Sequence, residues 1–471
     1  MDQHHVDPDI LRAVGDVGRP ERPYPRTPDL SHIPGEAGPI AAMTHLWGIT
    51  RHGRACLEDQ ARRCGPIYRM RLGRYDGVVT VDPVLSGQIL RNADGAWSTA
   101  LGWLAQLGTV VEAPTDMPLT LDFAHHRDVR RLLQPSFKAD ALAGYVDTAN
   151  RYFTTATDRW VADGRVDFKE AARRVFARVA ADVFMGIDDE REAEELDRAM
   201  ADFWRFVWAL VQSERVSPSF RASRRATRWF LDHFSPQVAK RRSSAGRDLF
   251  TRLCKTNEVV DWLDDEGLVR VLLGVMAAAF DTTSAAVTNM AYLLARNPEW
   301  QERLRSEALE LDTEVVDYEQ IKSLKRLECV WKEALRFYPV APGVVRIALR
   351  DLELSGHHIP AGTLVVARFS VAFRDPTIFA DPDRFDPERF APPRSEDKHC
   401  NGAFMPFGAG HHACIGAQLS GLEGKAFWYQ FLRKARIRLG RPYEARHEYR
   451  PLGMVSGDVS LVVEPLSALA V

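Results

Sequence analysis

The stretch "FMPFGAGHHACIG" (residues 404–416) stands directly before an amphipathic segment, "AQLSGLEGKAFWYQFLRK" (residues 417–434). Gly408 and Gly410 permit positive φ angles and close backbone approach, so this loop can lie against a flat ligand. Cys414 falls where the amides of the following helix point, and a helix N-terminus stabilises a thiolate. A thiolate without a second cysteine nearby suits either covalent catalysis or a single axial bond to a metal.

The other cysteines are scattered, and no C-x-x-C pair occurs among Cys56, Cys64, Cys254, Cys329 and Cys400. This pattern argues against a zinc site, an iron–sulfur cluster and a disulfide framework. Each of the five is expected to act as a small hydrophobic residue, and a reducing cytoplasm is the expected compartment.

Composition favours a protein that acts on small molecules. The chain of 471 residues has 62 basic and 64 acidic side chains, a net charge of -2, and no long block of like charge that would suggest a nucleic-acid partner. We expect one domain over residues 1–471. Residues 1–40 form a proline-rich lead-in without a membrane anchor, and the 57 residues after Cys414 are too few for a fused reductase.

Hydrophobic spacing predicts a mainly α protein with a small β portion. Helical periodicity runs through residues 141–164, 170–187 and 191–212. Alternating patterns in residues 65–83, with turns at Gly73 and Gly77, and in residues 349–369, with turns at Gly356 and Gly362, predict hairpins.

Residues 267–295 predict one long helix of about 40 Å that crosses the core. Asp281, Thr282 and Thr283 interrupt its apolar run, so a membrane span is the poorer interpretation. Buried polar groups are costly unless they are hydrogen-bonded or used in function. Without further context, neighbouring side chains or water satisfy them equally well.

The decapeptide "FGAGHHACIG" (residues 407–416) matches, position for position, the F-G-x-G-x-H-x-C-x-G signature of the cytochrome P-450 family of haem-thiolate monooxygenases. The chain resembles the soluble bacterial-type members. The resemblance implies the cytochrome P-450 fold, with the long central helix over haem b (iron protoporphyrin IX). It makes Cys414 the axial ligand of the iron and Phe407, Gly408 and Gly416 part of the cofactor-binding loop.

Further segments resemble the family in the right order. "EALR" (residues 333–336) resembles its E-x-x-R helix, and Arg389 in "DPERF" resembles the third member of a structural Glu333–Arg336–Arg389 cluster. Taken alone, Glu333 and Arg336 would more often form a solvated pair worth little.

Four residues are implied as ligands of the haem propionates: His126, Arg130, Arg346 and His412. His126 and Arg130 are four residues apart in "HRDVRR", and Arg346 follows Glu333 by thirteen residues. Without the resemblance, the first two would form an exposed basic patch, and His412 would cap a loop turn.

"AAFDTT" (residues 278–283) resembles the family's oxygen-activating segment. The resemblance implies that Thr282 and Asp281 are catalytic and deliver protons to the oxygen, which favours a reductase-fed monooxygenase over a peroxide-driven one. Ala279 departs from the glycine that the family often has there, which puts the bend of the helix in question.

The implied substrate is a steroid, terpenoid or fatty-acid-like molecule. By analogy, Ala278, Val344, Val345 and Met454 line its pocket, residues 97–113 form a lid and residues 203–211 a roof. The rings of Trp103, Phe203, Trp204, Phe206 and Trp208 make these two segments aromatic, and ordinary core packing explains about half of them equally well.

The implied reaction uses O2 as co-substrate and NAD(P)H electrons, delivered to a monomer by a ferredoxin or flavodoxin. Arg127, Arg131, His411 and Lys425 flank the expected cysteine side and are candidates for steering that partner, or ordinary surface charges. One alternative is a non-catalytic haem-thiolate sensor or haem-binding protein, but the presence of Asp281 and Thr282 argues against it. The other alternative is a thiol enzyme without haem.

Overall fold

The computed structural model describes residues 6–20, 24, 28–36, 38–72, 75–107, 115–208, 215–256, 260–449 and 452–466. Its helices are α1 (Pro8–Val14), α2 (Pro39–His52), α3 (Arg54–Cys64), α4 (Pro83–Arg91), α5 (Thr99–Leu107), α6 (Phe123–Leu133), α7 (Ala139–Asp163), α8 (Phe168–Met185), α9 (Glu190–Phe203), α10 (Pro218–Phe234), α11 (Val238–Arg242), α12 (Leu249–Thr256), α13 (Asp265–Arg296), α14 (Pro298–Glu310), α15 (Tyr318–Ser323), α16 (Lys325–Phe337) and α17 (Ala417–Lys434).

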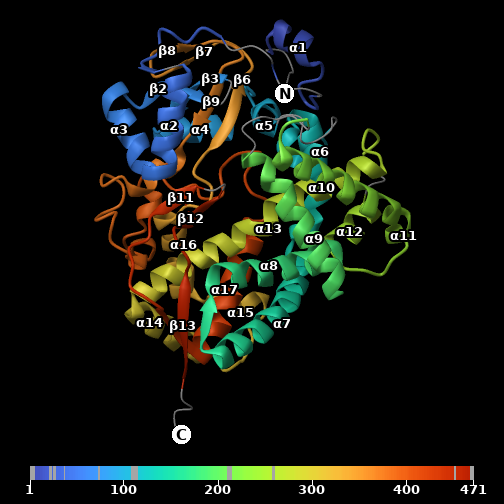
Figure 1. Ribbon diagram of the computed structural model, residues 1–471, viewed down its shortest axis with the longest axis vertical. Coiled ribbons are helices and arrows are strands. Elements are labelled where there is room, and N and C mark those ends of the chain that lie inside the picture. Colours follow the sequence, from blue (N-terminus) through green and yellow to red (C-terminus); the bar gives the residue numbers. More distant parts are fainter. Residues whose placement is uncertain are drawn as a thin grey trace.

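The strands are β1 (Gly35–Glu36), β2 (Ile67–Leu72), β3 (Tyr75–Thr80), β4 (Trp97–Ser98), β5 (Arg165–Asp167), β6 (Val344–Ala348), β7 (Leu352–Leu354), β8 (His357–Ile359), β9 (Leu364–Ala367), β10 (Ala435–Leu439), β11 (His447–Tyr449), β12 (Gly453–Val455) and β13 (Ser460–Pro465). A six-stranded sheet has the order β1-β2-β3-β9-β6-β4. This sheet lies with α2, α3 and α4 at one end of the molecule, and helices form most of the rest (Figure 1). The predicted mainly α fold with a small β portion is confirmed.

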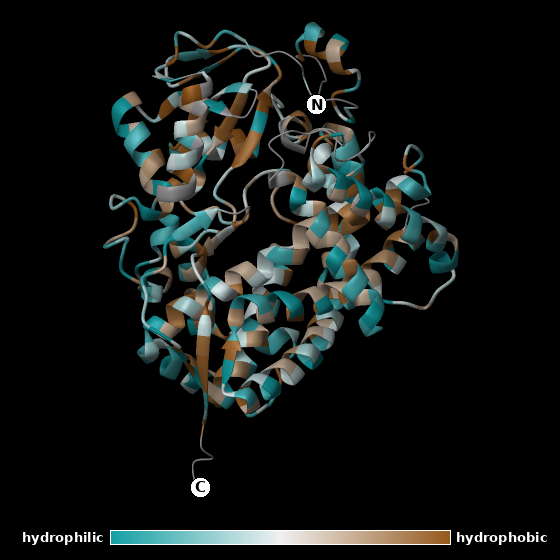
Figure 2. Ribbon diagram, viewed as in Figure 1, coloured by the Kyte–Doolittle hydropathy of each residue, from teal (hydrophilic) through white to brown (hydrophobic). Residues whose placement is uncertain are grey.

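Helix α13 crosses the core, as predicted, and packs against α8, α9, α10, α16 and α17. It is long and apolar enough to span a membrane, but 78% of its most apolar window is buried inside the protein, so it is a core helix. Hydroxyl groups along it donate to carbonyls one turn back, as Thr288 Oγ1 does to Ser284 O at 2.7 Å. These bonds satisfy polar side chains within an otherwise apolar helix. Figure 2 shows hydrophobic colouring along β6, in the main sheet, and along β13, which lies near the other end of the molecule.

Three local predictions change in the structure. The helix expected over residues 191–212 ends at Phe203 and continues as a 3-10 helix, Trp204–Trp208, while residues 209–212 lie outside the described part. Gly77 lies inside β3 opposite Met70 rather than in a turn, because β3 is paired on both sides and extends past it. Gly73 lies outside the described residues. Helix α1 was not predicted, although the Asp7 cap followed by Pro8 signals a helix start.

Candidate active site

The loop before α17 is folded by its own backbone hydrogen bonds. The Cys414 amide donates to the Phe407 carbonyl at 2.9 Å, and Gly408 and Gly410 both have the expected positive φ, 72°. A Cβ on Gly410 would lie 2.5 Å from the Leu90 carbonyl oxygen, at the end of α4. The glycine therefore allows the loop to pack closely on α4. The sequence had suggested that this glycine allows a close approach to a flat ligand instead.

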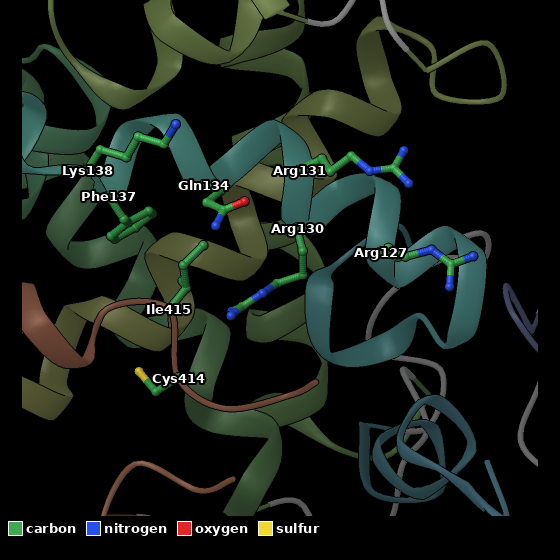
Figure 3. Close-up of a pocket in the computed structure, with 8 residues that line it drawn as sticks. All are labelled: Arg127, Arg130, Arg131, Gln134, Phe137, Lys138, Cys414 and Ile415. Atoms are coloured by element: carbon green, nitrogen blue, oxygen red, sulfur yellow. The ribbon is translucent and has the colours of Figure 1, made fainter. Parts of the chain in front are cut away.

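Cys414 opens onto a recess of about 400 Å³ that lies just before the N-terminus of α17. Figure 3 shows its lining side chains: Arg127, Arg130, Arg131, Gln134, Phe137, Lys138, Cys414 and Ile415. The surrounding protein raises the pKa of the Cys414 thiol, whereas hydrogen bonds from the amides of Gly416 and Ala417, together with the charge of Arg130, lower that pKa. The predicted stabilisation by the helix N-terminus is thus present, but it does not outweigh desolvation in the protein alone.

Arg130 connects the recess to a second, larger cavity. Its Nη1 donates to the Ala413 carbonyl at 3.1 Å, directly beside Cys414, and it extends toward the Cys414 loop (Figure 3). The second cavity has a volume of about 990 Å³, and its lining includes all four residues expected to bind propionates: His126, Arg130, Arg346 and His412. Residues far apart in the sequence therefore place nitrogen donors around one space that begins next to the cysteine.

The two histidines of this cavity lie against each other, with ring centroids 3.7 Å apart. Burial lowers the pKa of His126 to about 2, helped by the nearby His412 and Arg130, and burial also lowers the pKa of His412. Asp122 is the carboxylate that faces them, 3.5 Å from His412 Nε2, and it also accepts a hydrogen bond from the Thr99 amide. The whole lining holds three arginines (Arg127, Arg130 and Arg346) and three carboxylates (Asp16, Asp94 and Asp122), so the case for an anionic ligand rests on the arginine whose Nε lacks a partner among the described residues, Arg346.

Arg346 carries the clearest sign of a missing anion. It is 3% exposed, and its Nε has no hydrogen-bond partner among the described residues, while Nη1 donates to the Val345 carbonyl at 2.7 Å. Burial lowers its pKa to about 10. An uncompensated buried guanidinium is costly unless a ligand supplies the counter-charge. These residues fit a haem, which offers an iron atom to the thiolate and two propionates to the surrounding donors.

The middle of α13 has an open face, although most of the helix between its ends is buried. Ala278 is exposed and Thr282 is half-buried, one turn apart on the same face, and Ala279 is half-buried beside them. Thr282 Oγ1 donates to the Ala278 carbonyl at 2.9 Å. Thr283 points elsewhere, because its buried hydroxyl bonds Ser420 Oγ on α17 at 3.1 Å. This bond fixes the open part of α13 against the helix that follows Cys414.

Asp281 faces α8 and α9 rather than Thr282. Its Oδ1 is buried without a hydrogen-bond partner in the described structure, and burial raises its pKa to about 6. Arg173 on α8 acts in the opposite direction on that pKa and bridges Glu170 and Asp197, with Nη1 2.6 Å from Asp197 Oδ1. Sequence analysis missed these three residues, because α8 and α9 bring them to Asp281 only in the fold. A carboxyl with a pKa near neutrality can both accept and donate protons.

Glu333, Arg336 and Arg389 are all 0% exposed, so the solvated-pair interpretation is wrong. Glu333 accepts from Arg336 at 2.7 and 2.9 Å, and its Oε2 lies 3.2 Å from Arg389 Nε. Glu396 is a further member that sequence analysis missed, with Oε2 2.7 Å from Arg389 Nη1. The network joins α16 to the segment before the Cys414 loop.

Of the expected substrate-pocket residues, the structure separates Val344 from Val345. Alternate residues of a strand face opposite sides, and Val345, 5% exposed, packs into a buried cluster with Tyr68 and Val79. The two valines therefore do not line one wall, and Val344 alone stays a candidate beside Ala278. Met454 is half-buried on β12. The backbone of β12 is held to α13 by a hydrogen bond of 2.9 Å, which the Val455 amide donates to Asn289 Oδ1.

The aromatic roof is partly core. Phe203 and Phe206 are buried, whereas Trp204 is half-buried and donates from Nε1 to the Ala277 carbonyl at 3.1 Å. Trp103 of the expected lid is half-buried. The side chain of Trp208, residues 209–211 of the roof and residues 108–113 of the lid lie outside the described residues.

Two of the four expected steering cations line the Cys414 recess. Arg127 and Arg131 belong to its rim and extend away from the cysteine, and Lys138 joins them (Figure 3). His411 lines the other cavity. Lys425 is a correction, because its side chain is largely buried and Nζ bonds Glu328 at 2.7 Å, which removes it from the accessible charge.

The hairpin that carries Met454 gives a pH-dependent prediction. Burial lowers the pKa of His447 on β11 to about 3, so its neutral form stabilises the fold above pH 6.5, and this stability is lost as the pH falls toward 3. The loss is about 1.4 kcal/mol per pH unit. His447→Phe places a ring that does not titrate beside Tyr338 and Tyr449. When the pH is lowered from 7 to 5, we expect the free energy of unfolding to fall by about 2 kcal/mol less in this variant than in the parent protein. Urea unfolding at both pH values measures the difference, and equal losses would contradict it.

The family model described as cytochrome P450 matches residues 34–452. Among similar proteins, a putative cytochrome P450 136 of Mycobacterium tuberculosis is 31% identical over 93% of this chain and 89% of its own length. Cyclooctat-9-en-7-ol 5-monooxygenase of Streptomyces melanosporofaciens is 30% identical over 85% and 87%, and ent-kaurenoic acid oxidase 1 of Arabidopsis thaliana is 27% identical over 68% of each. The solved structure of a retinoic acid-bound cyanobacterial CYP120A1 shares the fold, with a TM-score of 0.80, 22% identity and coverage of 89% and 96%.

Proposed function

The chain belongs to the cytochrome P450 family of oxygen-incorporating, haem-dependent oxidoreductases, and from this premise we propose that it hydroxylates a hydrophobic small molecule with electrons from a separate redox protein. Cys414 would bind the haem iron through its thiolate. His126, Arg130, Arg346 and His412 would bind the propionates. When bound, the haem supplies the oxidising chemistry, which is the reduction of O2 and the transfer of one oxygen atom into a C–H bond.

The observation that carries this proposal is the unpartnered Nε of buried Arg346 in a cavity that begins beside Cys414. A non-catalytic haem sensor would need the same thiolate and propionate donors. It would have no use for Asp281, whose raised pKa of about 6 and buried, unpartnered Oδ1 suit a proton carrier. This residue favours the enzyme over the sensor.

The proposed substrate is terpenoid-like, with steroids and fatty acids as further members of the class. Support comes from the apolar open face at Ala278 and the half-buried rings of Trp204 and Trp103. Relatives named for cyclooctat-9-en-7-ol and ent-kaurenoic acid lend this class further support.

The proposed electron donor is a ferredoxin or flavodoxin that draws on NAD(P)H in the cytoplasm. Arg127, Arg131 and Lys138 would steer an acidic protein toward the Cys414 recess. Salt should therefore slow electron delivery, because exposed charges are screened within about 10 Å at 0.1 M ionic strength.

The test is an absorption spectrum of the haem-loaded, reduced and carbon monoxide-treated protein. Thiolate ligation by Cys414 shifts the Soret band to long wavelength. Haem-loaded, folded protein without that shift would remove the proposed function. A shifted band in a protein that consumes no reductant with any hydrophobic substrate would favour the sensor.

Thr282→Ala is expected to uncouple the reaction. If the Thr282 hydroxyl passes protons toward the oxygen substrate, its loss keeps haem and substrate binding but diverts electrons into hydrogen peroxide. General acid catalysis of this kind contributes roughly 10²- to 10⁴-fold. The measurement is oxidised product per electron donor consumed, with peroxide assayed in parallel.

Thr283→Ala is the matched control, because its hydroxyl bonds Ser420 on α17 instead of facing the open side of α13. It should change stability and leave the coupling ratio unchanged. Uncoupling by Thr283→Ala alone would contradict the assignment, and unchanged coupling in both variants would mean that protons bypass these hydroxyls.

A further inference from the structure

Residues 6–19, near the N-terminus, line the larger of the two cavities. Five residues of this segment belong to the lining: Val6, Leu11, Asp16, Val17 and Gly18. The same cavity is lined by the four expected propionate ligands, His126, Arg130, Arg346 and His412. The family model matches from residue 34 onward, so it assigns no role to this segment. A segment that the sequence describes as a lead-in is therefore part of the wall of the proposed cofactor cavity.

Apolar packing holds the first part of the segment, including helix α1, on the protein. Three of its side chains are at most 3% exposed: Ile10, Val14 and Val17. They share a buried cluster with Leu101 of α5 and Ile347 of β6. Figure 1 shows α1 at the end of the molecule that carries the main sheet. Because Arg346 directly precedes Ile347 on β6, the segment packs on the strand that carries one of the expected propionate ligands.

Arg19 fixes the other end of the segment. Its Nε and Nη2 donate to the two carboxylate oxygens of Asp116 at 2.6 and 2.9 Å. Asp116 is 0% exposed, so this bidentate ion pair is largely shielded from solvent. The Arg19 guanidinium also lies 5.0 Å from the centre of the Trp262 ring. Loss of Arg19 would leave Asp116 with Arg270, whose Nη1 is farther away, 3.6 Å from Oδ2.

Gly18 allows the backbone of the segment to lie against the start of α6. A Cβ on Gly18 would lie 2.7 Å from Nδ1 of His125, the residue before His126. The Gly18 carbonyl accepts a hydrogen bond of 2.9 Å from the Asp122 amide. The Asp122 carboxylate in turn faces His412 Nε2 at 3.5 Å. The segment is therefore bonded to the residue that faces one expected propionate ligand and packed against the neighbour of another.

We propose that residues 6–19 are a cofactor-retaining cover, in which Val17, Gly18 and Arg19 position the wall that closes the propionate side of the haem. This inference rests on the proposed function, because it takes the cavity as the place of the propionates. A cover that excludes water strengthens the contacts between carboxylates and guanidinium groups, since charges interact more strongly at a lower effective dielectric constant. Loosening the cover should therefore speed the loss of haem.

The test is the rate at which haem leaves the full-length, haem-loaded protein for an excess of apomyoglobin, followed by absorption. Arg19→Met removes the ion pair with Asp116 and keeps an apolar side chain of similar length. Haem loss should rise roughly 10-fold or more, as expected when hydrogen bonds to a charged group are lost. Arg12→Met is the matched control, because Arg12 lies in the same segment, has a side chain that is 77% exposed and pairs with Asp9 of the same helix. Its rate should equal that of the parent protein.

A second control separates the cover from general destabilisation. Arg241→Met breaks another largely buried ion pair, with Asp248, and neither residue belongs to the cavity lining. It should lower the melting temperature without speeding haem loss at temperatures well below melting. Amide hydrogen exchange of residues 7–19 in the haem-loaded protein should rise in Arg19→Met, whereas exchange in α13 should not.

Unchanged haem loss in Arg19→Met, an equal rise in Arg241→Met, or exchange that rises as much in α13 as in the cover would overturn the inference. If Arg19→Met does not fold or take up haem, Val17→Ala replaces it, because Val17 belongs to both the buried cluster and the cavity lining. Its haem loss should rise severalfold, and an unchanged rate would overturn the inference as well.

The carbon monoxide spectrum of the same samples keeps the two proposals apart. A shifted band with unchanged haem loss in Arg19→Met retains the enzyme and rejects the cover. Faster haem loss from a variant of a protein whose band is not shifted rejects the enzyme alone.

Discussion

Cys414→Ser should lose the long-wavelength Soret band of the carbon monoxide complex entirely. A serine hydroxyl is a far weaker donor to iron than a thiolate, and the amides of Gly416 and Ala417 that favour a thiolate cannot make serine ionise. The variant should remain folded, because Cys414 opens onto the recess instead of filling the core. Absorption spectroscopy checks the ligand, and the melting temperature checks the fold.

Cys400→Ser is the control for this prediction. Cys400 is half-buried against Phe404 and neighbouring apolar residues and has no place in the recess. Its replacement should leave the band in position. A long-wavelength band that persists in Cys414→Ser with normal haem content would show that another group ligates the iron.

Glu333→Gln should cost about 3–5 kcal/mol of folding free energy, because two guanidinium groups would lose their buried counter-charge. This is a large share of the roughly 5–15 kcal/mol by which a domain is stable. We expect little soluble haem protein at 37 °C and a midpoint of urea unfolding far below that of the parent.

Glu388→Gln is the matched control, since Glu388 pairs with Arg303 at the surface, with both side chains more than half exposed. An exposed pair contributes about 0–1 kcal/mol. Similar yields and unfolding midpoints for the two variants would show that Glu396 alone neutralises the buried arginines.

Local patterns predicted the features that depend on neighbours in the chain. The glycines of the Cys414 loop, the helix after it and the long central helix follow from spacing and backbone freedom, which the sequence carries directly. Gly77 shows the limit of this reasoning, because a glycine signals a turn unless partner strands on both sides extend the strand through it.

Lys425 shows the same limit for charge. A lysine after the cysteine reads as surface charge, yet α16 brings Glu328 to it and α17 buries it.

The sequence by itself therefore determined the family signature, the class of fold and the candidate thiolate, because these depend on residues within one turn or one loop. Tertiary structure alone decided which charges are neutralised and which are left for a ligand. Arg336 and Arg389 meet Glu333, whereas the Nε of Arg346 meets no acceptor among the described residues. The physical reason is that the energy of a buried charge is set by groups within a few ångströms, and segments distant in the sequence supply most of those groups.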